Sequence, residues 1–215
     1  MDFKYNKVFL TGSDQATEWM LPWFMKHFKL RNHKNLVFAD FGVSPKARNF
    51  METQCIDVID LKDNQEKGWF KKPMAMLKCP SKYTVWVDTD CEFKHNCDEI
   101  FDLIKPNKLL MGHDRPWIKR SGEIWHNSGV VGFVNKPMIL QKWVEKVRVE
   151  PIQGDQETLH MMLDPLQKMM YIEDLHNMYN VLRLQIDTDG YTGKRKILHW
   201  TGYKGKIEIR KMIRE

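Results

Sequence analysis

The chain has 215 residues, of which 42% are hydrophobic and 29% are charged, and its formal net charge is +6. This length and composition favour one folded α/β domain with a sizeable core over a disordered chain, and no segment approaches the roughly 18 consecutive apolar residues that a membrane helix needs. The basic residues are scattered and accompany no zinc-finger spacing or RNA-binding aromatic signature, which disfavours nucleic acid as the main partner.

The N-terminus runs directly into the first expected strand without a signal-peptide region, which favours a cytoplasmic protein. The four cysteines show no C-x-x-C spacing, so we expect reduced thiols and no disulfide. Strands are expected at residues 7–11, 36–39, 55–59, 82–87, 109–112, 130–134, 170–172 and 196–200. Helices are expected at 16–28, where Pro22 can kink or delay the start, at 69–77, 137–147 and 155–163, and after Gly205. This alternation indicates βαβ units and a mostly parallel sheet, with no linker at which to divide the chain.

The most informative segment is 85–90, where a short apolar run ends in Asp88-Thr89-Asp90. Such a run is typical of a strand buried on both faces, and open α/β sheets bind ligands at the carboxyl ends of their strands. Two carboxylates close together favour a hard divalent cation, which could carry a diphosphate. The spacing alone leaves two interpretations open, a metal site or a pair of solvated aspartates at a strand end.

Three later segments place polar side chains at the ends of further elements. They are Asn127-Ser128-Gly129, Asp155-Gln156, and the segment from His199 through Gly202 to Lys204. The first offers amide and hydroxyl groups that suit sugar hydroxyls. The second places a carboxylate and an amide at a helix start, where they point into a cleft. The third offers an imidazole that completes a metal shell with two carboxylates, and a glycine loop with a lysine that suit a diphosphate.

In this order, the motifs resemble those of the GT-A-fold nucleotide-sugar glycosyltransferases, most nearly the glycogenin-like family 8 group. The resemblance rests on Thr11-Gly12, Lys72 or Lys78, Asp88-Thr89-Asp90, Asn127-Ser128-Gly129-Val130, Asp155-Gln156, and His199-Trp200-Thr201-Gly202 with Lys204. The chain departs from the family in its last motif, because Lys204 stands one residue early, Lys206 one residue late, and no Pro-Trp follows. Within the group, the chain is similar to the N-terminal glycosyltransferase domain of chlorella-virus enzymes that glycosylate the capsid protein.

The resemblance implies a Rossmann-like GT-A domain over residues 1–215, with a central mostly parallel mixed sheet flanked by helices. Its nucleotide-binding half would span about 1–112 and its acceptor and sugar half about 113–215. The implied reaction moves a hexose from a nucleotide-sugar, by preference a UDP-sugar, to a hydroxyl of a protein-linked glycan or another acceptor, with retention of anomeric configuration. The sequence does not identify the sugar, the acceptor or the oligomeric state.

The family also implies roles for particular residues. Asp88, Asp90 and His199 would hold Mn²⁺ or Mg²⁺, with Asp90 and His199 as direct ligands and Asp88 between the metal and the ribose. Catalytic residues on the sugar side would be Asp155 and Gln156. The donor nucleotide-sugar would further contact Thr11, Gly12, Asp40, Lys72, Thr89, Asn127, Ser128, Gly202 and Lys204.

Other functions remain open on the sequence. A nucleotidyltransferase would share the sheet and the carboxylate pair, but residues 11–14 lack the glycine- and arginine-rich loop expected after its first strand. A phage or viral enzyme that glycosylates DNA bases is compatible with the basic charge, and an inactive binding module would retain the fold. A second motif, Asp187-Thr188-Asp189, is interpreted as a turn, whereas His113-Asp114 either contacts a sugar or packs a loop.

Overall fold

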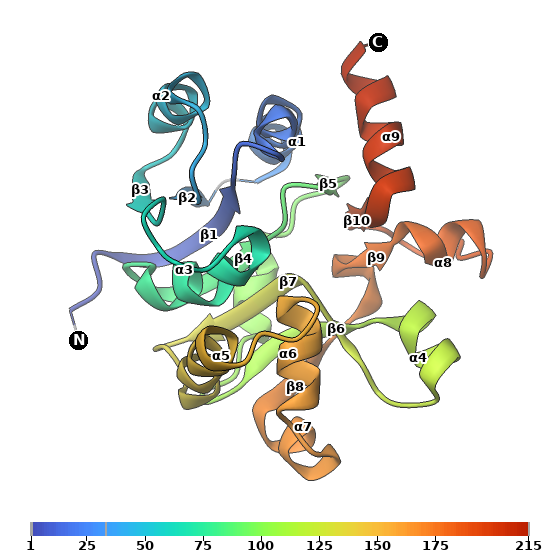
Figure 1. Cartoon of the computed structure of the whole chain (residues 1–215). Coiled ribbons are helices and arrows are strands. Elements are labelled where there is room, and N and C mark those ends of the chain that lie inside the picture. The colour runs from blue at the N-terminus through green and yellow to red at the C-terminus, as the bar shows by residue number, and fades with distance from the viewer. Residues whose placement is uncertain (1, 33, 215) are drawn as a thin grey trace.

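A seven-stranded sheet crosses the centre of the molecule in the computed structural model, which describes residues 2–32 and 34–214 (Figure 1). Across the sheet, its strands are β3 (Asp57–Asp60), β2 (Asn35–Asp40), β1 (Tyr5–Ser13), β4 (Ser81–Val87), β7 (His126–Val134), β6 (Leu109–His113) and β8 (Ile172–Leu175). β7 is antiparallel to its neighbours β4 and β6, and every other pair of adjacent strands is parallel. The expected mixed, mostly parallel sheet is therefore confirmed.

A second, smaller sheet stands beside the carboxyl end of β4. Its strands are β5 (Cys91–Phe93), β10 (Ile197–His199) and β9 (Val181–Leu182). β5 and β10 are antiparallel, and their register places His199 opposite Cys91. This pairing brings a residue from near the end of the chain next to the acidic doublet that follows β4.

Helices cover both faces of the large sheet and give the molecule two hydrophobic cores (Figure 1). The α-helices are α1 (Leu21–Arg31), α2 (Pro45–Gln54), α3 (Lys72–Lys78), α4 (Arg115–Ser121), α5 (Met138–Val149), α6 (Asp155–Met161), α7 (Pro165–Tyr171), α8 (Arg183–Asp187) and α9 (Gly202–Arg214). The 3₁₀ helices are η1 (Glu18–Met20), η2 (Gly68–Lys71), η3 (Asp98–Leu103) and η4 (Asn177–Tyr179). α1, α2 and α9 contribute to one core, and α3, α5 and α6 contribute to the other. Along β1, Phe9 faces the first core while Val8 and Leu10 face the second, which explains why the strand is apolar at successive positions.

Proline and polar caps define where several helices begin. Pro22 occupies the first turn of α1, so it delays the helix until Leu21 without kinking it. Pro45 begins α2, and the Ser44 side chain caps that helix by accepting from the Ala47 amide. The expected helix at 16–28 is therefore a short 3₁₀ turn followed by a helix.

The expected strands are confirmed with one exception. The segment 170–172 was expected to be a strand, but α7, which begins with a capping box of Asp164 and Gln167, extends to Tyr171, and β8 begins only at Ile172. β7 begins earlier than expected, at His126. All four cysteines are free, as expected. None of the described helices is long and apolar enough to cross a membrane.

Candidate active site

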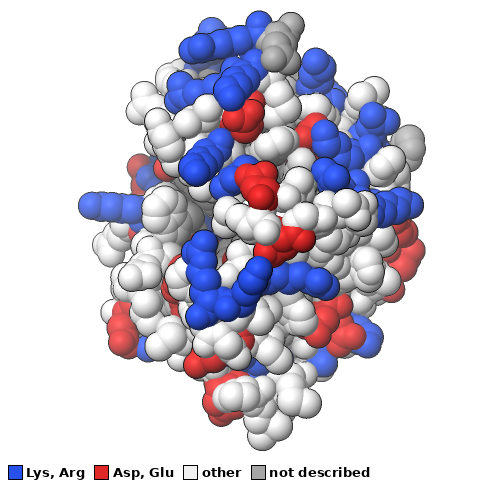
Figure 2. Space-filling model, turned by 90° about the vertical axis from the view of Figure 1, so that its right-hand side faces the viewer, with Lys and Arg blue, Asp and Glu red and all other residues white. Residues whose placement is uncertain are grey.

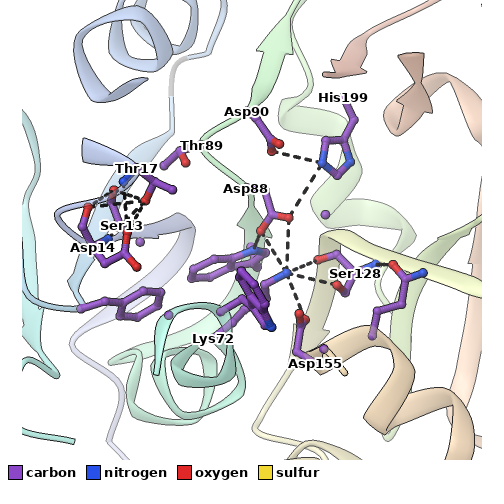
Figure 3. Close-up of a pocket in the computed structure, with 18 of the residues that line it drawn as sticks. Ser13, Asp14, Thr17, Lys72, Asp88, Thr89, Asp90, Ser128, Asp155 and His199 are labelled. Carbon is purple, nitrogen blue, oxygen red and sulfur yellow. Dashed lines mark hydrogen bonds and ion pairs between the residues drawn. The ribbon is translucent and has the colours of Figure 1, made fainter. Parts of the chain in front are cut away.

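A cavity of about 480 Å³ opens at the carboxyl ends of β1 and β4. This is the edge at which open α/β sheets bind ligands. The predicted site residues that line it are Gly12, Lys72, Asp88, Thr89, Asp90, Asn127, Ser128, Asp155, Gln156 and His199. In Figure 3, the labelled side chains of Lys72, Asp88, Asp90, Ser128, Asp155 and His199 converge from α3, the end of β4, β7, α6 and β10. The fold therefore brings together motifs that lie far apart in the sequence.

The acidic doublet and the late histidine meet at this cavity. Asp90 Oδ1 lies 3.1 Å from His199 Nε2, and Asp88 Oδ2 lies 3.9 Å from the same nitrogen (Figure 3). Gly129 makes room for the ring, because a Cβ at this position would lie 2.2 Å from His199 Cε1. Carboxylate oxygens and an imidazole nitrogen at such distances are a donor set that Mn²⁺ or Mg²⁺ accepts.

A chain of buried amides fixes which nitrogen of His199 faces the doublet. Asn127 Oδ1 accepts from the Gly129 amide at 2.9 Å, so the side-chain nitrogen of Asn180 must be the group that donates to Asn127 at 2.9 Å. The oxygen of Asn180 then faces His199 Nδ1 at 3.1 Å, which places a proton on Nδ1. Nε2 is consequently the nitrogen available on the side of Asp88 and Asp90. Asn180 has no recognisable motif around it and was therefore not predicted as a site residue.

Lys72 lies at the centre of the cavity wall and bridges two carboxylates. Its Nζ is 3.0 Å from Asp88 Oδ1 and 3.1 Å from Asp155 Oδ2, and it donates to the carbonyl and hydroxyl oxygens of Ser128 (Figure 3). Burial alone would lower the pKa of Lys72, but Asp155 and Asp88 more than offset this effect and raise it. The structure thus holds Lys72 charged between two acidic side chains.

A second lysine, Lys206 on α9, pairs with the other aspartate of the doublet. Its Nζ lies 2.8 Å from Asp90 Oδ2, and the residue lines the cavity. Burial alone would raise the pKa of Asp90, but His199 and Lys206 together hold it below its usual value. Asp90 is therefore an anion in the folded protein and available as a ligand for a cation.

On the opposite side of the cavity, amides and a carboxylate form a connected network. Asp114 Oδ2 accepts from Asn127 Nδ2 at 3.2 Å and from Gln156 Nε2 at 3.0 Å. Gln156 Oε1 in turn accepts from the side chain of Asn127 and the backbone amide of Ser128. Asp114 also caps α4 by accepting from the Trp117 amide. Asp114 therefore both packs the start of α4 and contacts the predicted sugar-side residues, so both interpretations of His113-Asp114 fit these contacts.

The end of β1 forms the third wall. Gly12 is required there by packing, because a Cβ would lie 2.7 Å from Phe41 Cζ and 3.0 Å from the Ala39 oxygen. Next to it, Thr17 Oγ1 lies 2.8 Å from both Ser13 Oγ and Asp14 Oδ1 (Figure 3). This wall presents hydroxyl and carboxylate groups beside an aromatic ring.

Four predicted residues do not line this cavity: Thr11, Asp40, Gly202 and Lys204. Thr11 is fully buried. The Asp40 carboxylate is occupied by the amides of Gly42 and Val43 and by Arg48, whose Nη1 lies 2.8 Å away. The other two occupy exposed positions at the start of α9, where Gly202 has a φ of 71° and Lys204 lines a separate small cavity.

The second Asp-x-Asp motif lies away from the cavity, as its interpretation as a turn requires. Asp187 ends α8 and pairs with Arg183, while Asp189 lies 3.0 Å from Lys119 on α4. Trp69 was not predicted as a site residue, but it lines the cavity and is 59% exposed. Exposed tryptophan is a common surface for sugars and bases, but eight tryptophans gave no means of selecting this one.

No model of a known protein family and no curated protein matches the chain. Several solved structures, however, are similar to it. The glycosyltransferase GlyE of Streptococcus pneumoniae TIGR4 is similar with a TM-score of 0.68 and 17% identity, over 93% of this chain and 55% of that one. The galactosyltransferase LgtC, in complex with donor and acceptor sugar analogues, is similar with a TM-score of 0.65 and 14% identity, over 91% of this chain and 87% of that one.

A third similar structure is a glycosyltransferase involved in glycosylation of the major capsid of PBCV-1. Its TM-score is 0.62 at 14% identity, and the match covers 98% of this chain and all of that one. By contrast, this chain spans about half the length of GlyE, at 55%. At such low identities, the shared property is the fold. The chain therefore has the GT-A fold, a mixed and mostly parallel sheet between helices, that the resemblance implied.

Proposed function

We propose that the protein is a metal-dependent glycosyltransferase that moves a hexose from a nucleotide-sugar, by preference a UDP-sugar, to a hydroxyl acceptor. The observation that carries this proposal is the convergence of Asp88, Asp90 and His199 on one cavity with Asn127 and Gln156. Both amide side chains are held by hydrogen bonds to Asp114. A cation-binding cluster and a set of groups suited to sugar hydroxyls face each other there. The glycosyltransferase fold of the similar structures supports the same reaction.

The donor atoms fit Mn²⁺ or Mg²⁺. Asp90 and His199 would be direct ligands, since Asp90 is held as an anion and His199 turns Nε2 toward the doublet while its Nδ1 contacts Asn180. Asp88 would reach the same ion or the ribose of the donor. When bound, the ion would neutralise charge that develops on the leaving diphosphate.

The remaining lining residues have separate tasks in this proposal. Lys206 would exchange its contact with Asp90 for a phosphate oxygen, which makes it a better candidate than Lys204 for the phosphate lysine. Asp155 and Gln156 would hold the sugar through its hydroxyl groups, with Lys72 keeping Asp155 in place. Retention of configuration is proposed from the family resemblance, and the proposal assumes no covalent nucleophile.

We further propose a protein-linked glycan as the acceptor, because the match to the capsid glycosyltransferase of PBCV-1 extends over both chains almost completely. Duplex DNA has less support as an acceptor. Basic side chains are frequent on the side of the molecule that holds α4, α8 and α9, but acidic side chains lie among them (Figure 2). Several of these basic side chains already form ion pairs, as Lys119 does with Asp189 and Lys211 does with Glu208. A partly neutralised surface attracts the phosphate backbone weakly.

The test is a screen of UDP- and GDP-sugars for donor hydrolysis, with and without Mn²⁺. Wild type should consume at least one donor only when the ion is present, and Asp90→Asn should lose this activity. A matched control exists in Asp189→Asn, which changes the same residue type in the second Asp-x-Asp motif and should behave as wild type. Absence of donor binding and turnover under every condition would refute the proposal.

A further inference from the structure

A second group of metal-ligating side chains lies outside the cavity described above. His113, His126 and Asp174 each offer one ligand atom, and these atoms all lie within 4.8 Å of one another. Asp174 Oδ1 lies 2.9 Å from His126 Nε2 and 3.1 Å from His113 Nε2. We propose that these three residues form a binding site for a transition-series dication, with Zn²⁺ as the ion. This proposal does not depend on the transfer reaction.

The backbone holds the three side chains in place from three adjacent strands. His113 ends β6 and His126 begins β7, and the two are directly opposite in the antiparallel register. Asp174 lies on β8, on the other side of β6, paired with Met111. Ligands on paired strands keep their spacing better than ligands on loops, so the site is largely formed before an ion arrives.

Asp174 holds the two imidazoles differently, because it hydrogen-bonds His126 Nε2 at 2.9 Å but not His113 Nε2. Although His113 Nε2 is buried and near Asp174, it has no hydrogen-bond partner among the described residues. A missing bond at this distance means that the nitrogen does not point at the carboxylate oxygen. Ligands of one ion behave in this way, because they point at a shared centre and lie side by side about 3.4 Å apart in a tetrahedral zinc shell.

The donor set also discriminates between ions. Two imidazoles and one carboxylate favour Zn²⁺ over the hard ions Mn²⁺ and Mg²⁺, which prefer oxygen. An entry path exists, since a cavity of about 820 Å³ is lined by all three residues and shares no lining residue with the first cavity. Asp174 is 65% exposed at its side chain, so an ion can reach it from solvent.

Such an ion would lie next to the proposed sugar side of the active site. His113 is followed by Asp114, and His126 is followed by Asn127, the two residues that share a hydrogen bond in the sugar-side network. By joining β6, β7 and β8, the ion would fix the ends of the strands that carry this network.

The experiment measures zinc stoichiometry by equilibrium dialysis for wild type, Asp174→Asn, His126→Asn and two control variants. Asp174→Asn should bind one ion fewer than wild type. The matched control is Glu173→Gln, which alters the neighbouring carboxylate on β8, paired with Lys105 and Lys108, and should keep the wild-type stoichiometry. Asp90→Asn should retain the zinc ion at the new site, which separates this site from the first cavity.

Two measurements on the same samples guard against misfolding. Co²⁺ should give visible absorption bands of a tetrahedral nitrogen and oxygen site in wild type, and His126→Asn should lose them. Zn²⁺ should raise the Tm of wild type and of Glu173→Gln, but raise it less for Asp174→Asn. If Asp174→Asn and His126→Asn keep the wild-type stoichiometry, or if Asp90→Asn removes all zinc binding, the proposal is overturned.

Discussion

Gly129→Ala tests whether the position of His199 controls metal binding. A Cβ at this position would lie 2.2 Å from His199 Cε1, 2.4 Å from Nδ1 and 2.9 Å from Asn127 Oδ1. All three distances are below ordinary contact, and the backbone of β7 leaves the glycine no room to retreat, because its carbonyl accepts from the Asp88 amide at 2.9 Å. The imidazole must therefore shift from its present position beside Asp90.

We expect Gly129→Ala to lower both the stability of the protein and its affinity for Mn²⁺. Packing an extra methyl group into a filled site costs about 1–3 kcal/mol of unfolding free energy. A displaced ligand should also weaken Mn²⁺ binding about tenfold or more, which corresponds to about 1.4 kcal/mol. Titration followed by the electron paramagnetic resonance signal of free Mn²⁺ gives the Kd, and urea denaturation gives the stability.

Gly132→Ala is the matched control on the same strand. Its Cβ would lie 3.1 Å from Ile104 Cγ1 and 3.3 Å from Leu110 Cβ, so it also crowds a packed region but only against apolar side chains. It should lose stability and keep the wild-type Kd for Mn²⁺. A folded Gly129→Ala protein that binds Mn²⁺ as tightly as wild type would show that His199 does not contribute to the ion site.

Three further predictions concern lysines. Lys206→Ala should raise the donor KM at least several-fold in steady-state assays, because Lys206 faces Asp90 in the cavity. Lys204→Ala should leave KM unchanged. Equal effects of the two substitutions would reject Lys206 as the phosphate lysine. Lys72→Met should cost about 3–5 kcal/mol in urea denaturation, since it strands the two carboxylates that the lysine bridges, and a loss below 1 kcal/mol would contradict the role of Lys72 as their counter-charge. Burial lowers the pKa of Lys136 from 10.5 to about 8, so the unfolded chain binds more protons than the folded protein between these values. The unfolding free energy of wild type should then rise relative to that of Lys136→Met by about 1.4 kcal/mol per pH unit across that window. If urea denaturation shows the same pH dependence of the unfolding free energy for both proteins, the prediction is wrong.

The sequence predicted the parts of the site that depend on local pattern. A short apolar run places Asp88 at the end of a central strand, and that placement follows from burial alone. The helices at 45–54 and 165–171 were not predicted, because at 10 and 7 residues they are too short to show a clear apolar period, and their starts depend on caps at Ser44 and Asp164. The fold class was predictable because strands and helices alternate, whereas boundaries set by capping were not.

Sequence spacing could not decide whether Lys204 or Lys206 faces the cavity. Lys204 and Lys206 are two residues apart on α9, so their side chains point about 200° apart around the helix axis. Only one of them can face the cavity, and the choice depends on how α9 packs against the rest of the chain. Asn180 is a stronger case, because its function in the network comes entirely from contacts with Asn127 and His199, which are distant in sequence.

Two lysines balance the acidic side chains that surround the cavity. Three aspartates, Asp88, Asp90 and Asp155, lie around one space, and isolated burial of such charges would be costly. Lys72 compensates two of them and Lys206 compensates the third. Because Lys72 is enclosed by the sheet and α3 while Lys206 is on the last helix, the two lysines are not equivalent. Lys72 is part of the scaffold that keeps Asp88 and Asp155 apart. Lys206 is on an element that borders the cavity, so it is the charge that a cation at Asp90 would displace, which then leaves Lys206 free to pair with a diphosphate.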